Sequence, residues 1–232
     1  MSAPGKAVKD TWRRENVRFY PRSFTGPQQG PTFSIPNKET HPMRAWDYMA
    51  KFLTESILQK IVRETNRYGR SKGIKSNWEH IDVKKFKCFI GIMLYLGIAD
   101  LPTYRMIWSD ELLFGVPQLK NTMTVNDFES ILFALHFVNN LEENDSDHEN
   151  DKLKKVRPLV DHFQKRFRAV YNPSRCLSAD EAIVKFKGRV SFKTYNPAKP
   201  TKYGYKVWML CDRNGYVVWF EIYIGKSTED ED

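Results

Sequence analysis

Apolar side chains recur every three or four positions through the first half of the chain, which is the spacing of helices with one buried face. The first stretch starts after Pro42 and stops before Gly69, so we expect one long amphipathic helix there. Its apolar face comprises Trp46, Met49, Ala50, Leu53, Ile57 and Ile61.

Two further stretches carry helix-start signals. Asp82 precedes a densely apolar run that closes near Gly97, and aspartate caps helices by accepting a backbone N–H, so we expect a second helix that is a buried core element. Thr124 and Asp127 resemble a capping box and predict a third helix over 125–138. The whole of 42–138 is therefore expected to be helical.

A fourth helix is predicted within 153–172, after an acidic, aromatic-free segment at 139–152 that is expected to be a disordered linker. The outer face of this helix is basic, which suits either solvent or a phosphate backbone. Its basic residues are Lys154, Lys155, Arg157, Lys165, Arg166 and Arg168.

From residue 173 onward the pattern changes to β-branched and aromatic runs: CLSADEAIVKFKG, YGYKVWMLCD and YVVWFEIYIGK. The intervening DRNG, Asp212 to Gly215, has the chemistry of a hairpin turn. Three consecutive antiparallel strands over 173–228 follow, so the expected fold class is α+β. Residues 1–41 predict an irregular basic arm, and 229–232 predict a frayed acidic tail.

Composition narrows the class of protein. With 232 residues, 41% of them hydrophobic, the chain can bury a core, and its net charge of +9 favours a polyanionic partner. The three cysteines are far apart and form no CxxC pair, which argues against a disulfide framework and favours a reducing compartment. The most apolar segment, FKCFIGIMLYLGIA, is too short to cross a bilayer, so no membrane partner is expected.

Two adjacent acids, Asp180 and Glu181, begin the first strand region. Successive side chains on a strand face opposite ways, so these two carboxylates cannot easily share one metal ion. A single acid on a strand is most often a surface charge. The residues alone therefore leave a site and a surface role both open.

A basic stretch follows the acid pair. Between Ala182 and Cys211 there are seven Lys or Arg, no Asp or Glu, and interleaved aromatic residues, a combination that suits a DNA backbone and its flanking bases. A solvated hairpin with lysines lying along its apolar surface is the alternative. The candidate DNA-binding residues are Lys185, Lys187, Arg189, Lys193, Lys199, Lys202 and Lys206.

The segment LSADEAIVKFKGRVSFKTYNPAKPTKYGYKVWMLCD resembles the core signature of the piggyBac transposases and the piggyBac transposable element-derived proteins. The shared features are the Ser-x-Asp-Glu strand, the Phe-Lys-Gly-Arg turn, YNPAKPTKYG, and a strand ending in Cys-Asp. Upstream, FIGIMLYLGI, YRMIWSDE and FESILFALHFVNN are similar to the helical region of that family. The resemblance extends over residues 30–226.

This resemblance implies a helical dimerisation and DNA-binding region at 42–138, joined to the first three strands of a ribonuclease H-like catalytic domain at 173–228. It implies that Asp180 is the first of three catalytic aspartates and a ligand of Mg²⁺ in two-metal DNA strand cleavage and transfer. Glu181 would be a structural neighbour. The implied partners are double-stranded DNA, as transposon ends and TTAA target, and a second copy of the chain, in the nucleus.

The chain departs from the family pattern after the third strand. The second and third aspartates of the family lie beyond that strand, and residues 1–232 reach neither. Asp212 opens a turn and Glu221 lies within a strand, so neither is expected to replace them. We therefore expect a truncated transposase that does not cut DNA as it stands; the alternative is a domesticated, non-catalytic DNA- or chromatin-binding protein.

Overall fold

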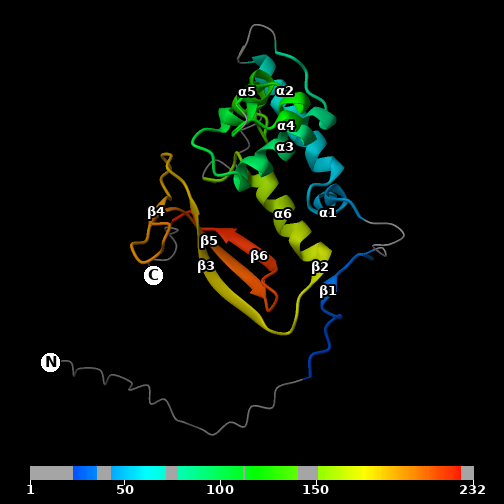
Figure 1. Ribbon diagram of the computed structural model, residues 1–232. Coiled ribbons are helices and arrows are strands. Elements are labelled where there is room, and N and C mark those ends of the chain that lie inside the picture. The colour runs from blue at the N-terminus through cyan, green and yellow to red at the C-terminus, as the bar shows by residue number, and fades with distance from the viewer. Residues whose placement is uncertain (1–22, 36–42, 72–77, 112, 141–150, 226–232) are drawn as a thin grey trace, which may run out of the picture.

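The computed structural model describes residues 23–35, 43–71, 78–111, 113–140 and 151–225. Helices gather at one end and strands at the other, with α6 running between them (Figure 1). The elements are β1 (Gly30–Pro31), α1 (Ala45–Phe52), α2 (Glu55–Ser71), α3 (Val83–Ile98), the 3-10 helix η1 (Tyr104–Trp108), α4 (Pro117–Thr122), α5 (Val125–Ala134), α6 (Arg157–Val170), β2 (Tyr171–Asn172), β3 (Leu177–Lys185), β4 (Thr194–Tyr195), β5 (Tyr203–Asp212) and β6 (Val217–Ile222). The α+β class is confirmed.

The single long helix predicted after Pro42 is wrong, because two helices occupy that stretch. The Leu53 N–H closes α1 on the Met49 carbonyl, and the carbonyl of Thr54 then accepts the first bond of α2 from the Leu58 N–H. Threonine is a favoured residue at such a helix start. The apolar spacing continues across the break, so periodicity alone could not reveal it.

Nor does α2 end before Gly69, as the sequence predicted. It continues to Ser71, and a Cβ at Gly69 would stand 2.4 Å from the indole of Trp78. Glycine here allows the 78–83 segment to approach the helix closely. The residue that resembled a stop signal is a packing residue.

The helix starts that the sequence predicted for α3 and α5 are confirmed. Asp82 accepts the Lys85 N–H at 2.6 Å, and the Thr124 hydroxyl accepts the Asp127 N–H at 3.1 Å. However, α5 ends at Ala134, short of the predicted 138, because the following residues turn toward α2.

The helical core is centred on Phe128, which is 1% exposed. Its ring lies 5.1 Å from that of Phe89 and 5.2 Å from that of Trp108. The prediction that all of α3 is buried is wrong. Its first half enters this core through Phe86, Phe89 and Ile92, whereas apolar residues of its second half are exposed.

The three predicted antiparallel strands are confirmed. They pair in the order β3–β5–β6, and the short β4 also pairs with β5. Helix α6 packs on β6: the Gln164 side chain donates to the Phe220 carbonyl at 2.7 Å, and the Phe167 and Phe220 rings lie 5.6 Å apart. This contact joins the helical and strand parts of the molecule.

Three arginines of the basic face of α6 make contacts within the protein. Arg157 makes two hydrogen bonds of 2.7 Å to Asp151, and the Arg166 side chain donates to the Lys51 carbonyl. Arg168 lies over the ring of Trp219 at 4.4 Å. These three arginines stabilise the packing of α6, whereas Lys155 and Lys165 are exposed, so a phosphate contact of the remaining face stays a prediction.

Part of the predicted irregular arm has a fixed place. β1 pairs with β2, and the Thr32 N–H donates to the Val170 carbonyl at 3.0 Å. The arm residues 1–22 and 36–41 lie outside the described residues, as do 141–150 of the acidic segment and the tail 229–232. No helix among the described residues is long and apolar enough to cross a membrane.

Candidate nucleic-acid interface and metal-ligand position

Asp180 lies in the middle of β3, exposed, on the face of the sheet that α6 covers further along. Its cross-strand partner is Met209, which in turn pairs with Phe220. Residues directly opposite each other on neighbouring strands point to the same face of the sheet. Because the Phe220 ring contacts α6, the side chains of Phe220, Met209 and Asp180 all lie on the α6 side of the sheet. Its Oδ1 accepts the Glu181 N–H at 2.7 Å. Within the described chain, β3 pairs only with β5.

Glu181 lies on the opposite face and is neutralised there. Its carboxylate accepts from the Lys206 ammonium at 2.6 Å, and that ammonium lies 4.1 Å from the Trp208 ring centroid. The strand therefore separates the two acids, as its alternation predicts. Glu181 and Lys206 form a structural ion pair, which leaves Asp180 as the carboxylate available to a ligand.

Asp212 has the predicted turn role. Its Oδ1 accepts the N–H groups of Asn214 and Tyr216 at 2.9 and 3.1 Å, and its Oδ2 accepts from Gln29 of the arm at 2.8 Å. Burial by itself would raise the pKa of Asp212, but these hydrogen bonds outweigh it and the pKa lies below its ordinary value. This carboxylate is fully used inside the fold.

A metal centre is not assembled by the residues that the structure describes. Among them there is no cluster of three or more His, Cys, Asp or Glu placed to hold an ion. Asp180 could offer one carboxylate to a metal ion, whereas two-metal phosphoryl chemistry needs several carboxylates.

The basic stretch after β3 folds around a hollow of about 480 Å³, which we call the lysine hollow. Three of its lysines are exposed, and Lys193 is held by a 3.0 Å bond to the Gly188 carbonyl. Its lining residues are Lys185, Phe186, Lys187, Lys193, Pro200, Thr201, Lys202 and Tyr203. Four of the seven candidate DNA-binding residues thus meet in one place.

Two aromatic residues, Phe186 and Tyr203, line the lysine hollow, and each contacts a further ring outside the lining. The Phe186 and Tyr205 rings lie 4.6 Å apart, Phe192 lies 5.5 Å from Tyr205, and Tyr195 lies 4.6 Å from Tyr203. Burial raises the pKa of Tyr205, consistent with its packed position. Cationic side chains beside such rings match the chemistry of a nucleic-acid backbone and bases.

The other three candidate DNA-binding residues are placed differently. Lys206 is committed to Glu181, and Lys199 donates to the Glu181 carbonyl at 3.4 Å. Arg189 is exposed on the loop after β3, outside the lining of the hollow. The lysine hollow is therefore the compact part of the predicted basic track.

Comparison with known proteins identifies the family. A family model described as Transposase IS4 matches residues 44–232, most of the chain. The chain belongs to this transposase family. Within it the protein is piggyBac-like, because it is 30% identical over 202 residues to human PiggyBac transposable element-derived protein 3. The aligned region covers 87% of this chain and 33% of the human protein. The piggyBac resemblance of the sequence is confirmed.

Further relatives agree with this assignment. The chain is 30% identical over 170 residues to human PiggyBac transposable element-derived protein 2, covering 73% of this chain and 28% of that one. A cryo-EM structure of a piggyBac transposase synaptic complex with hairpin DNA matches with a TM-score of 0.74 and 25% identity, over 88% of this chain and 43% of that one. The chain thus spans about a third of the length of the curated relatives.

A second basic surface was missed from the sequence. Three arginines, Arg63, Arg67 and Arg70, follow one another on the polar face of α2. Their spacing of four and three residues is the same helical period that identified the apolar face, so the signal was present in the sequence.

Proposed function

We propose that this chain binds duplex DNA as part of a piggyBac-like transposase, and that the lysine hollow contacts the DNA backbone. The observation that carries the proposal is the convergence of four lysines on a hollow that Phe186 and Tyr203 also line. The solved piggyBac complex with hairpin DNA, to which this fold is similar, supports the same partner. Transposon ends and a TTAA target are the duplexes we expect.

The proposal is tested by fluorescence anisotropy of a labelled duplex across salt concentrations. Phosphate-driven binding gives a linear fall of log K with log salt, with a slope of about −0.9 per neutralised phosphate. In K185Q/K187Q/K202Q we expect the slope to become shallower by about two to three units. The control K60Q/K84Q/K120Q removes the same charge from the helical region. Equal losses in the two variants, or a salt-independent parent, would refute the role of the hollow.

We propose further that Asp180 is a ligand of Mg²⁺. The exposure of its carboxylate and the neutralisation of its neighbour Glu181 support this assignment. A bound Mg²⁺ would polarise a phosphoryl oxygen. Asp180 is part of no cluster of three or more potential ligands among the described residues, so no cleavage step is assigned to them.

We accordingly propose that residues 1–232 bind DNA without cutting it. The assay is strand cleavage and end joining with Mg²⁺ on terminal-repeat and TTAA duplexes, with Asp180→Asn as the control. We expect no product from either protein. Robust cleavage that disappears in Asp180→Asn would contradict the proposal.

The alternative function is that of a domesticated DNA- or chromatin-binding protein. Such a protein also does not cleave DNA, but it differs in which duplexes it binds preferentially. A transposase part favours terminal repeats, whereas a domesticated module has no need to do so. Competition between terminal-repeat and scrambled duplexes separates the two. For both functions we propose that the protein is located in the nucleus, because its DNA partner lies there. Imaging of the tagged chain tests this localisation.

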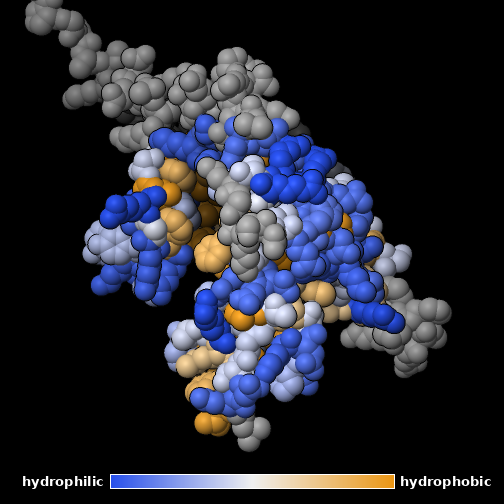
Figure 2. All heavy atoms as spheres, turned by 90° about the horizontal axis from the view of Figure 1, so that it is seen from above, coloured by the Kyte–Doolittle hydropathy of each residue, from blue (hydrophilic) through white to orange (hydrophobic). Residues whose placement is uncertain are grey.

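A homodimer through the second half of α3 is also proposed. Leu94 and Ile98 of α3 are 51% and 87% exposed, and Phe133 of α5 is 65% exposed. Figure 2 shows, from above, hydrophobic patches within a mainly hydrophilic surface. Exposed apolar patches are typical of interfaces. Light scattering after size exclusion should give a dimer that L94K/I98K converts to monomer; a monomeric parent would contradict this.

A further inference from the structure

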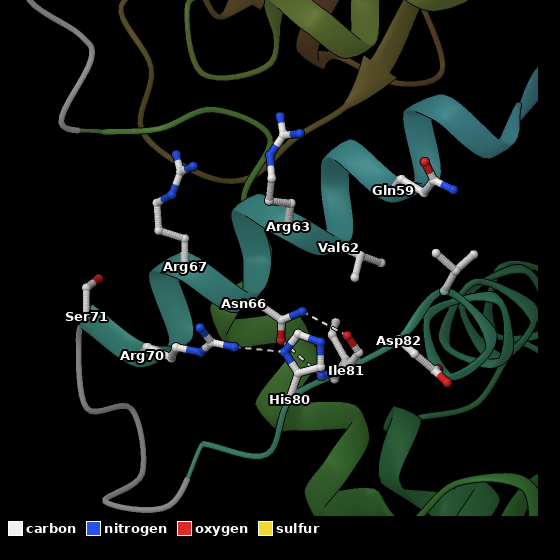
Figure 3. Close-up of a pocket in the computed structure, with 11 residues that line it drawn as sticks. Gln59, Val62, Arg63, Asn66, Arg67, Arg70, Ser71, His80, Ile81 and Asp82 are labelled. Atoms are coloured by element: carbon white, nitrogen blue, oxygen red, sulfur yellow. Dashed lines mark hydrogen bonds between the residues drawn. The ribbon is translucent and has the colours of Figure 1, made fainter.

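The polar face of α2 borders an open hollow of about 720 Å³ (Figure 3). One wall is α2, which contributes Arg63, Arg67 and Arg70; we call these three residues the arginine row. The opposite wall is the segment that leads into α3, and it contributes His80 and Asp82. The positive charge that lines the hollow is therefore confined to one wall.

Two arginines of the row are held in place by a buried carboxylate. Glu64 is 4% exposed and accepts from Arg63 Nε at 3.0 Å and from Arg67 Nη1 at 2.7 Å. The two arginine side chains are themselves 63% and 40% exposed. A guanidinium has five N–H donors, so each arginine keeps donors for an external acceptor while its position is fixed.

The third arginine is paired with a histidine of the opposite wall. Arg70 Nη2 lies 3.0 Å from His80 Nδ1, and a guanidinium can only donate, so Nδ1 accepts and the proton of the neutral ring is on Nε2. Both residues are exposed, and both retain N–H donors. All three arginines are thus oriented by contacts inside the protein and still have donors to offer.

The wall that carries His80 is held at a fixed distance from α2. The Asn66 side chain donates to the Ile81 carbonyl at 2.8 Å, and its oxygen accepts from the Ile81 N–H at 2.9 Å and from Trp78 Nε1 at 3.1 Å. Figure 3 shows Asn66 reaching across from the helix to this segment. The two walls are consequently preorganised, which lowers the entropic cost of binding.

Asp82 makes the opposite wall unfavourable for a uniform polyanion. Its side chain is exposed, and the hydrogen bond that it accepts from the Lys85 N–H leaves its negative charge in place. A nucleic-acid strand carries a negative charge at every nucleotide, so it would bring phosphate towards this carboxylate as well as towards the arginine row. A peptide can place acidic side chains against one wall and a neutral side chain against the other. The charge pattern therefore favours a peptide.

The apolar part of the lining favours the same class of partner. Val62 of α2 and Val83 of the opposite wall both line the hollow. A phosphate backbone offers nothing apolar to cover them, whereas an aliphatic side chain of a peptide does.

The spacing of the arginine row matches a helical peptide. Its steps of four and three residues correspond to about 6.0 and 4.5 Å along the axis of α2. Acidic residues spaced by four and three on a second helix have the same separations, whereas residues on one face of an extended peptide repeat every 6.6–6.8 Å or about that distance. Carboxylates at helical spacing can therefore each meet one arginine of the row.

We propose that the arginine row, His80 and the two valines bind an acidic amphipathic helix of a partner protein. The carboxylates of that helix pair with the arginines, and an aliphatic side chain on the same face enters the hollow. This interaction uses neither the lysine hollow nor DNA, so it adds a protein partner to the proposed function.

The test measures, by fluorescence anisotropy, the binding of the full chain to a labelled alanine-rich helical peptide of about 16 residues. This patterned peptide carries three glutamates spaced four and three residues apart and one leucine on the same face. One control peptide has serine in place of the leucine, and another has the same composition with its glutamates spread around the helix. We expect the patterned peptide to bind about 3- to 10-fold more tightly than either control.

Two protein variants locate the contact. R70Q removes an arginine that does not pair with Glu64, and R63Q/E64Q/R67Q/R70Q removes the row without leaving the buried carboxylate charged. We expect R70Q to weaken binding of the patterned peptide about 2- to 5-fold, and the quadruple variant to weaken it about 10- to 100-fold.

The matched control is K60Q/K84Q, whose lysines lie outside the lining of the hollow. It lowers the net charge by two, as the quadruple variant does, and should change the peptide affinity by less than about 2-fold. If circular dichroism shows that the quadruple variant is unfolded, the comparison of R70Q with the parent and this control decides.

Several results would overturn the inference. These are a parent that does not bind the patterned peptide, equal affinity for the patterned and spread peptides, and unchanged peptide affinity in R70Q. A duplex that displaces the peptide and loses affinity in R70Q by the same factor would make the row a nucleic-acid contact instead. Self-association of the parent that R70Q abolishes would make it an interface between two copies. Selective peptide binding by a parent that does not bind duplex DNA would support this inference while overturning the proposed function.

Discussion

Replacement of Asn66 by alanine should strongly destabilise the helical region, because one side chain satisfies three polar groups. These are the N–H and carbonyl of Ile81, whose residue is 1% exposed, and the indole N–H of Trp78. In Asn66→Ala neither backbone group of Ile81 has a replacement partner on α2.

The magnitude follows from the burial of these groups. A buried polar group left without a partner costs about 1–3 kcal/mol, and the half-buried Trp78 N–H can regain water at a smaller cost of about 0.5–1 kcal/mol. For the two backbone groups of Ile81 and the indole N–H together, the sum is about 2.5–7 kcal/mol. That is a large share of the 5–15 kcal/mol that typically separates folded from unfolded states.

Urea denaturation followed by Trp fluorescence and circular dichroism measures the loss. The control is Asn126→Ala, an exposed asparagine on α5, which should change the free energy of unfolding by less than about 0.5 kcal/mol. A shift below about 1 kcal/mol for Asn66→Ala, with an unchanged denaturant slope, would refute the claim that Asn66 holds the two walls together.

Two other predictions concern packing and pH. Gly69→Ala gains about 1 kcal/mol of helix propensity but places its Cβ against Trp78, and the overpacking cost of about 1–3 kcal/mol should win; a raised Tm would contradict this. Asp212 has a folded pKa below its unfolded value of about 3.9, so its stabilising contribution is present above pH 4 and is lost as the pH falls through the folded pKa. Asp212→Asn should therefore be less stable at pH 7 and flatten the acid limb of stability against pH, and an acid limb identical to the parent's would refute this.

The local features of the fold were predictable and the tertiary ones were not. Asp82 and Thr124 were recognised as helix starts because a cap depends on residues within one turn. The end of α5 was misplaced because it depends on α2: the His136 N–H donates to the Thr65 hydroxyl, and the His136 ring stacks on Tyr68 at 3.5 Å. No local pattern encodes such a contact.

In the candidate site, too, the local features were predictable from the sequence and the tertiary contacts were not. Strand alternation was enough to separate Asp180 from Glu181. The pairing of Glu181 with Lys206 depends on the β3–β5 register, so a residue predicted to contact DNA turned out to be committed to an internal ion pair. The exposed half of α3 was predicted to be buried because apolar density does not reveal what covers a helix.

Lysine acetylation footprinting, with and without a bound terminal-repeat duplex, shows whether the lysine hollow contacts DNA. Mass spectrometry then reports the reactivity of each lysine. The account predicts that DNA protects Lys185, Lys187 and Lys202, while Lys84 on α3 reacts equally in both states. Unchanged reactivity of all three hollow lysines under conditions in which anisotropy shows the duplex to be bound would contradict it.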